Sequence, residues 1–289
     1  MPILLLLAFF LSVAHVSAEI IEEKALHMGT LVRLATEFDP TSPTVTPAHV
    51  RTTLTGGMNR IAELEALLSE YRPGNDLAKL AQAAGKHPVK VHHMVFDVLK
   101  EALRLGDLTA GAFDITFKPL GRLWNVEHLL TPPPAGAIAI TKRLVDYRLV
   151  QLDDLAGTVF LPLAGMEIAL GGLAKGYIID AAADYLRNHG LTRFLVDGGG
   201  DLRLVGSKTT GPWRVGIRHP RRPDQFLRVV AVKDLAVVTS GDYERFTMLD
   251  GKRYHHIIDP VSGKPGLGCQ SVTVIHRDTM TADGLATGV

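Results

Sequence analysis

Residues 168–206 read IALGGLAKGYIIDAAADYLRNHGLTRFLVDGGGDLRLVG and set the pattern for the rest of the chain. The glycine pair Gly171-Gly172 precedes a segment from Leu173 to Asn188 that we expect to be a helix, ended by Gly190. Two short apolar segments, 193–197 and 201–205, flank three glycines and are typical of strands. A helix followed by two neighbouring strands indicates a core that mixes both element types.

The same mixture extends outward in both directions. We expect helices over 48–70, over a short stretch capped by Asn75-Asp76, over 91–106 and early in 141–150. Strands are expected over 24–38, around 148–152, as a hairpin over 158–170, and near 213–217, 226–232, 235–239 and 270–276. TPPPAG at 131–136 predicts a surface turn. Because strands dominate the second half without a fixed repeat, the sequence favours a mixed α/β (α+β) fold in a single compact domain over a regular βαβ array.

The composition excludes several classes of protein. Of the 289 residues, 46% are hydrophobic and 21% are charged, which is typical of a globular chain rather than a disordered one. The net charge of +1 gives no reason to expect a nucleic-acid partner. The single cysteine, Cys269, excludes an intramolecular disulfide and a thiolate metal cluster.

The first eighteen residues have the pattern of a secretory signal. ILLLLAFFLSVA at residues 3–14 is an apolar run too short for a membrane-spanning helix, and Val16-Ser17-Ala18 supplies the small residues of a cleavage site. No Lys or Arg precedes the run, so an uncleaved anchor stays an alternative. We expect residues 1–18 to be a signal peptide and residues 19–289 to be an exported domain that is not an integral membrane protein after cleavage.

Two glycine-rich stretches are candidates for a phosphate site. Gly171-Gly172 precedes a helix whose N-terminus would offer free N–H groups to an anion, and Lys175 follows within the first turn. VDGGGDLRLVG at 196–206 places Asp197 and Asp201 beside three glycines. Neither stretch is a Walker A loop or a dinucleotide fingerprint, and a tight turn or a bulged hairpin accounts for each of them as well.

Two later stretches hold residues suited to acid–base or metal chemistry. His255 and His256 in RYHHIIDPVSGKPG, residues 253–266, point to opposite faces if they lie on a strand, so at most one of them faces a given cleft and accepts a proton there. In TADGLATG, residues 281–288, Asp283 and Thr287 share one face of a helix. An oxygen-only set of this kind suits Mg²⁺ rather than zinc. A structural histidine, and a helix-terminal Asp with a surface Thr, stay alternatives.

Taken in order, these stretches resemble the ApbE family of flavin transferases. The blocks LLSEYRPGNDLAKL, GAFDITFKPL, LGGLAKGYIID, VDGGGDLRLVG, SGDYERF, HHIIDPVSGKPG and TADGLAT follow one another between about Met28 and Thr287. The resemblance implies an FAD:protein FMN transferase: a threonine or serine hydroxyl of a target protein attacks the FMN-side phosphorus of FAD, AMP leaves, and FMN stays on the target. It implies Mg²⁺ as cofactor and FAD as substrate. It also implies an acceptor protein of a membrane redox complex with a Ser/Thr flavinylation motif, in the bacterial periplasm or at the outer face of the inner membrane.

The resemblance also implies roles for individual residues. Contacts with FAD are implied for Met28, Tyr71, Ala112, Phe113, Asp114, Lys175 and Ile257. The backbone carbonyl of Gly172 is implied as a metal ligand together with Asp283 and Thr287, and His256 as the general base. Tyr71 would offer a flat face to an aromatic ring, and Asp114 would accept hydrogen bonds from ribose or adenine.

Two departures from the family pattern keep other functions open. Ala169 stands where the family has an aspartate that contacts FAD, and the chain stops at Val289 where family members continue, so we expect the C-terminal end of the domain to be missing. With water as the nucleophile, the same site would be an FAD pyrophosphatase that produces FMN and AMP. With weakened binding it would be a non-catalytic FAD-binding protein. The sequence does not separate transfer from hydrolysis, because the two reactions differ only in the attacking group.

Overall fold

The computed structural model describes residues 19–38, 40 and 45–289, so the expected signal peptide lies outside the described residues. A six-stranded sheet forms the centre, in the order β1-β2-β6-β7-β10-β15, with every neighbouring pair antiparallel. Its strands are β1 (Glu19–His27), β2 (Thr30–Phe38), β6 (Phe194–Gly198), β7 (Leu202–Val205), β10 (Leu235–Gly241) and β15 (Ser271–His276).

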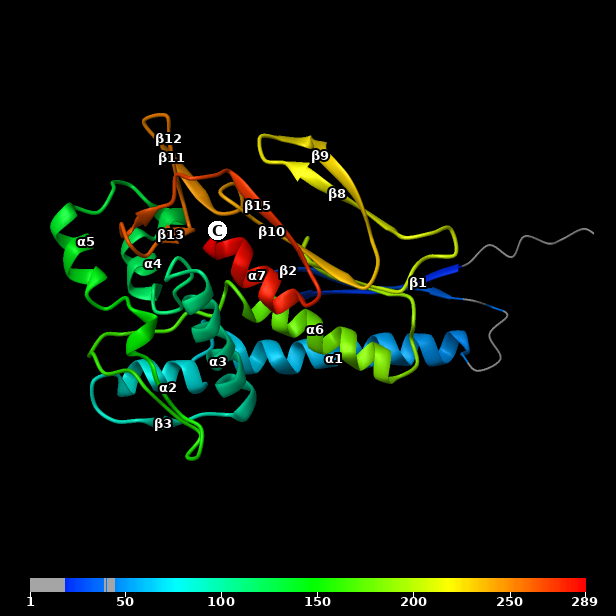
Figure 1. The fold of residues 1–289 in the computed structure, drawn as a ribbon, viewed down its shortest axis with the longest axis horizontal. Helices are drawn as coiled ribbons and strands as arrows, with labels where there is room; N and C mark the ends of the chain where they lie inside the picture. Colours follow the sequence, from blue (N-terminus) through cyan, green and yellow to red (C-terminus); the bar gives the residue numbers. More distant parts are fainter. Residues whose placement is uncertain (1–18, 39, 41–44) are drawn as a thin grey trace, which may run out of the picture.

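Three helices cover one face of this sheet, as Figure 1 shows: α1 (Pro47–Leu68), α6 (Ala174–Asn188) and α7 (Thr279–Gly288). Helix α1 begins where the Thr46 hydroxyl accepts the N–H of His49 at 3.2 Å, with Pro47 in its first turn. Its buried residues recur at helical spacing and pack against buried strand residues such as Leu34 and Phe194. The main core therefore lies between this sheet face and the three helices.

A second region, residues 70–160, packs at one end of the sheet and contains the remaining helices. These are α2 (Asp76–Ala83), α3 (His93–Leu108), α4 (Lys118–Trp124) and α5 (Ala135–Lys142), with the single-turn 3₁₀ helices η1 (Val126–His128) and η2 (Tyr147–Leu149). A small sheet in the order β3-β5-β4 joins β3 (Val89–Lys90), β4 (Gln151–Asp153) and β5 (Thr158–Phe160). Two short hairpins follow later in the chain: β11 (Phe246–Leu249) with β12 (Lys252–His255), and β13 (Ile258–Asp259) with β14 (Lys264–Pro265).

The other face of the central sheet is partly covered by a long hairpin, which we call the arm: residues 213–232, with β8 (Trp213–His219) and β9 (Arg222–Val232). Trp213 and Val232 at its base pack against Leu195, Leu204 and Val237 of the sheet. Most of β9 is exposed to solvent, and in Figure 1 the arm stands away from the helical layer.

The mixed α/β (α+β) prediction is confirmed, but several element predictions are wrong. The single strand expected over 24–38 is two strands, because Met28 and Gly29 adopt left-handed φ angles of 53° and 71° and form a tight hairpin turn. The hairpin expected over 158–170 reduces to β5, and the segment after it contains no described strand. Residues 131–136 (TPPPAG) run directly into α5, which covers Ala135–Lys142. The helix expected within 141–150 therefore lies earlier in the chain. The expected cap of α2 is confirmed, since Asn75 accepts the N–H of Ala78 at 3.0 Å.

Candidate functional site

One cleft of about 1450 Å³ lies at the end of the central sheet nearest the second region. Its walls come from the β1–β2 turn, the loop after α3, the N-terminus of α6, the segment after β12, and α7. All eleven residues with an implied role line it: Met28, Tyr71, Ala112, Phe113, Asp114, Gly172, Lys175, His256, Ile257, Asp283 and Thr287. The volume exceeds the roughly 300–1000 Å³ of a typical small-molecule pocket, so the cleft is large enough for a ligand of dinucleotide size.

An oxygen-rich corner of the cleft fits a hard cation. Asp283 is 4% exposed, and one of its carboxylate oxygens accepts the N–H of Gly176 at 3.0 Å. Thr287 lies one turn further along α7, and a Cβ on Gly172 would stand 3.3 Å from its hydroxyl oxygen. Glycine at 172 therefore leaves room beside Thr287 for an ion or a phosphate. Among the described residues no group of three or more His, Cys, Asp or Glu is placed to hold a metal, so an ion here would need further oxygens from the backbone, from hydroxyl groups, from water or from a bound substrate.

Asp283 is an unusual carboxyl group because of this burial. Burial raises its pKa to about 7, nearby Asp201 adds to the rise, and Lys175 opposes it. A divalent cation would favour the ionised carboxylate, since metal ligands bind in their deprotonated form.

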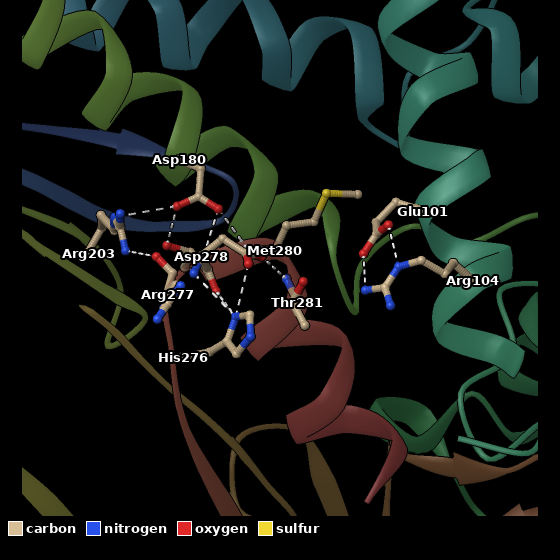
Figure 2. Close-up of polar contacts among 10 residues, drawn as sticks. Glu101, Arg104, Asp180, Arg203, His276, Arg277, Asp278, Met280 and Thr281 are labelled. Atoms are coloured by element: carbon tan, nitrogen blue, oxygen red, sulfur yellow. Dashed lines mark hydrogen bonds and ion pairs between the residues drawn. The ribbon is translucent and has the colours of Figure 1, made fainter. Parts of the chain in front are cut away.

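Helix α7 owes its position to a polar junction with α6, shown in Figure 2. The carboxylate of Asp180 accepts the N–H groups of Thr279 at 2.7 Å and Met280 at 3.0 Å, and the Thr279 hydroxyl at 2.7 Å. Asp278 caps the helix by accepting the N–H of Thr281 at 2.8 Å. A Cβ on Gly176 would stand 2.5 Å from the carbonyl oxygen of Thr279, so glycine is needed where the two helices meet. These contacts fix Asp283 and Thr287 relative to Gly172.

Lys175 stands in the first turn of α6 and brings a positive charge close to the oxygen-rich corner. Its Nζ lies 2.5 Å from an oxygen of Asp201, which is buried. Burial acts to lower the pKa of Lys175, but Asp201 and Asp283 outweigh it and raise that pKa above its ordinary value. The lysine is therefore charged and available to a phosphate. The sequence marks Asp201 as a candidate acceptor, and the structure adds its ion pair with Lys175.

The two adjacent histidines have different surroundings. His255 is 5% exposed, does not line the cleft, and shares a hydrogen bond through Nε2 with the carbonyl oxygen of Gly266 at 2.6 Å. His256 lines the cleft, and its Nδ1–H donates to the carbonyl oxygen of Arg245 at 3.2 Å, because a carbonyl only accepts. Burial, helped by the charge of Arg245, lowers the pKa of His256 to about 4. At neutral pH this imidazole is uncharged, with a lone pair on Nε2.

The loop from Ala112 to Asp114 is held by the aspartate itself. One oxygen of Asp114 accepts the N–H of Thr116 at 2.7 Å and its hydroxyl at 2.6 Å, and the other accepts the N–H of Tyr147 at 2.9 Å. Burial raises the pKa of Asp114 despite these bonds. The carboxylate thus fixes the loop and keeps little capacity for the ribose or adenine contact that the resemblance implies.

The remaining candidates lie at the rim and on the walls. Tyr71 is 77% exposed, so its ring is free to cover a ligand. The N–H of Met28 donates to Glu65 at 2.7 Å, and the carbonyl oxygen of Ile257 accepts the N–H of Gly266 at 3.0 Å. Ala169 is buried in the wall and offers no side-chain acceptor.

Sequence reasoning missed four acidic residues of the cleft, Glu65, Glu70, Glu127 and Glu244. Glu70 lies 3.6 Å from Lys118, and burial raises its pKa. Glu65 and Glu70 stand near the C-terminal end of α1, where charged residues are common on a helix surface, so no pattern marked them.

Among the described residues no helix has the length and apolarity needed to cross a bilayer.

Comparisons with known proteins identify the family to which this fold belongs. The model of the ApbE family matches residues 28–289. An FAD:protein FMN transferase of Vibrio cholerae is 35% identical over 234 residues, which cover 79% of this chain and 70% of the relative. Another of that name from Treponema pallidum is 37% identical over 259 residues, covering 83% and 71%. The crystal structure of the ApbE protein of Thermotoga maritima superposes with a TM-score of 0.84 at 32% identity, covering 93% of this chain and 86% of that one. The flavin transferase ApbE from Vibrio cholerae gives 0.81 at 32% identity, covering 94% and 86%.

Proposed function

This chain belongs to the ApbE family and is a flavin transferase that uses FAD, and on that premise we propose that it moves FMN to a threonine or serine hydroxyl of an acceptor protein with the help of Mg²⁺. One observation carries the proposal: the oxygen-rich corner, the charged Lys175 and the neutral His256 line the same cleft. Phosphoryl transfer needs charge neutralisation, alignment of the nucleophile and a proton acceptor, and the cleft offers a residue for each.

The carbonyl oxygen of Gly172, the carboxylate of Asp283 and the hydroxyl of Thr287 would hold the ion. Bound there, Mg²⁺ would neutralise charge on the pyrophosphate oxygens. Lys175 and the N–H groups at the start of α6 add positive potential on the same side.

His256 would serve the acceptor hydroxyl. Its Nε2 lone pair accepts the hydroxyl proton while the acceptor oxygen bonds to the FMN-side phosphorus. The bond from that phosphorus to the bridging oxygen breaks, and AMP leaves with the electron pair. Arg245 fixes the ring because its carbonyl oxygen accepts Nδ1–H.

The test combines the purified protein, FAD, Mg²⁺ and a detergent-solubilised membrane fraction of the source bacterium. We expect a protein band with covalent flavin fluorescence in a denaturing gel, together with free AMP. EDTA, or Asp283→Ala, should lower the transfer rate by at least about 100-fold, because the pyrophosphate charge would no longer be neutralised. Asp154→Ala is the matched control, since Asp154 is an exposed carboxylate outside the cleft.

Other outcomes point to the other readings of the site. Free FMN and AMP without a fluorescent protein band would favour an FAD pyrophosphatase, and FAD binding without products would favour a binder. Full transfer in EDTA would contradict the metal assignment.

We also propose that residues 1–18 are removed on export and that the enzyme acts in the periplasm or at the outer face of the inner membrane, on a protein of a membrane redox complex. The apolar run and the small residues before Glu19 support this proposal. Mass spectrometry of the protein from the periplasmic fraction should give Glu19 as its first residue. A chain that keeps Met1 and stays in the cytoplasm would contradict it.

A further inference from the structure

The arm borders the cleft with the edge of a strand. Six consecutive residues of β8, from Trp213 to Arg218, line the cleft, whereas Phe226 is the one residue of β9 that does so. Side chains along a strand alternate between its two faces, so consecutive residues reach one cavity only where the strand presents its edge. The other edge of β8 pairs with β9, and no further described strand pairs with it. The described residues therefore leave a row of β8 backbone N–H and C=O groups unpaired along the cleft.

The arm also concentrates positive charge. Residues 213–232 contain five arginines and one acidic residue, Asp224, in a chain whose net charge is +1. Arg221 is held by Asp242 in a two-bond pair at 2.6 and 2.5 Å, and Arg218 lies 3.6 Å from Glu244. Arg214 is exposed and forms no ion pair with a described residue. Its charge is thus free to meet an acidic partner.

The two faces of β8 differ in character. Val215 joins the apolar cluster beneath the arm, next to Leu195 and Leu204. On the opposite face a Cβ on Gly216 would stand 2.6 Å from the ring of Phe226, so the glycine lets that ring lie across the strand. Phe226 remains 67% exposed. A strand added beside β8 would therefore meet an apolar face on one side and, on the other, two arginines around an aromatic ring.

We propose that the acceptor polypeptide binds in extended form along the free edge of β8, as an added strand with acidic side chains toward Arg214 and Arg218 and apolar side chains toward Val215 and Ile217. This rests on the proposed function, because the acceptor hydroxyl must reach the same cleft that holds FAD. Continuity with that cleft and the charge of the arm identify the occupant as an acidic segment of the acceptor. Backbone pairing supplies affinity that tolerates variation in the acceptor sequence, and the alternating faces supply selectivity.

The first test reverses the free charge. Arg214→Glu should raise the KM for the acceptor in the solubilised membrane fraction at least tenfold and leave the Kd for FAD within twofold. Arg51→Glu is the matched control, because Arg51 is an exposed arginine of α1 outside the cleft. Transfer by Arg214→Glu at the wild-type KM would overturn the proposal.

The second test addresses the backbone. Successive residues of a strand direct their N–H groups to opposite edges, so one of Arg214→Pro and Val215→Pro removes a bond to β9 and the other removes a donor from the free edge. The variant that keeps the wild-type Tm should lower the transfer rate at least tenfold while binding FAD normally. Arg214→Ala is the control for Arg214→Pro, because it removes the same charge and keeps the backbone N–H. Normal transfer by that variant would overturn the proposal. If both variants lose stability, the arginine reversal decides.

The outcomes separate this proposal from the one on which it rests. A wild-type chain that modifies nothing contradicts the proposed function itself. A wild-type chain that transfers FMN, together with an Arg214→Glu variant that transfers equally well, contradicts only the role of the β8 edge. Phosphatidylglycerol vesicles serve as a further probe. If the wild type but not Arg214→Glu sediments with them while both modify the solubilised acceptor equally, the arm binds lipid and the proposal is wrong.

Discussion

His256, the proposed proton acceptor, lies in surroundings that keep its ring neutral and make it a weak base. Its Nδ1–H is committed to Arg245, so the free lone pair is on Nε2. A pKa of about 4 means that nearly every molecule holds the ring in its neutral form at pH 7, although a weaker base takes up a proton less readily. In the proposed reaction, a base this weak would need charge neutralisation by the other groups of the site to lower the barrier.

We expect the ring of His256 to remain neutral in the free protein from pH 8 to about pH 5, measured by NMR of its Cε1–H signal. The folded pKa of about 4 lies below the ordinary value near 6.5, so the unfolded chain binds the proton more readily. The stability that this difference contributes is complete above pH 6.5 and is lost as the pH falls toward 4, by up to about 3 kcal/mol. His256→Gln should therefore reduce the fall in the free energy of unfolding between pH 6.5 and 4, measured by urea denaturation. His87→Gln, at an exposed position, should not; equal slopes in both variants would contradict the assignment.

The sequence predicts which residues surround the cleft better than it predicts how each is used. The blocks that resemble the family carry ten of the eleven residues with an implied role, and Met28 precedes them. The role of Asp114 differs from the implied contact with ribose or adenine, because its carboxylate accepts hydrogen bonds from Thr116 and from Tyr147, which is distant in the chain. The pair between Lys175 and Asp201 likewise joins a helix to a strand. A pattern within one stretch of sequence does not show which groups from distant stretches will become its hydrogen-bond or ion-pair partners.

At the scale of elements, the junction between α6 and α7 controls the oxygen-rich corner. Asp180→Ala would remove three hydrogen bonds at the start of α7 and leave the N–H groups of Thr279 and Met280 without that acceptor. We expect a loss of about 2–4 kcal/mol in the free energy of unfolding. Mn²⁺ affinity, measured by electron paramagnetic resonance as a stand-in for Mg²⁺, should fall as well. Asp184→Ala on the same helix, whose carboxylate is exposed, should change neither quantity by much. Unchanged Mn²⁺ affinity in Asp180→Ala would show that the junction does not position the metal ligands.

Elements with strong periodicity were predictable, and those decided by single turns were not. Helix α1 and the cap of α2 follow from apolar spacing and from Asn75. The β1–β2 turn escaped prediction because Met28 takes a left-handed φ that side chains rarely adopt. The two-residue strands β13 and β14 are too short to have a periodic pattern. Their position follows instead from tertiary contacts, such as the Trp124 indole N–H donating to Gly263 at 2.8 Å.

At the scale of the whole molecule, the cleft joins residues from Met28 to Thr287, so a ligand bound there stabilises the entire fold. With FAD at 100 times its Kd and Mg²⁺ present, binding should add about 2.7 kcal/mol. For a chain of this size that corresponds to a rise in Tm of about 4–6 °C, measured by differential scanning calorimetry. The rise should be smaller without Mg²⁺ and smaller for Asp283→Ala with it. An equal rise in all three cases would mean that FAD binds without using the oxygen-rich corner.

The order of strands in the central sheet has a consequence for the time course of folding. Val32 and Leu34 of β2 pair with Gly198 and Val196 of β6, so the first hairpin finds its neighbour only after more than half of the chain has been made. Pairings so distant in sequence are slow to form, because a long loop must close before any contact compensates for it. We therefore expect the central sheet to be completed late, and the cleft, whose walls come from both halves of the chain, to bind FAD only after β2 has paired with β6.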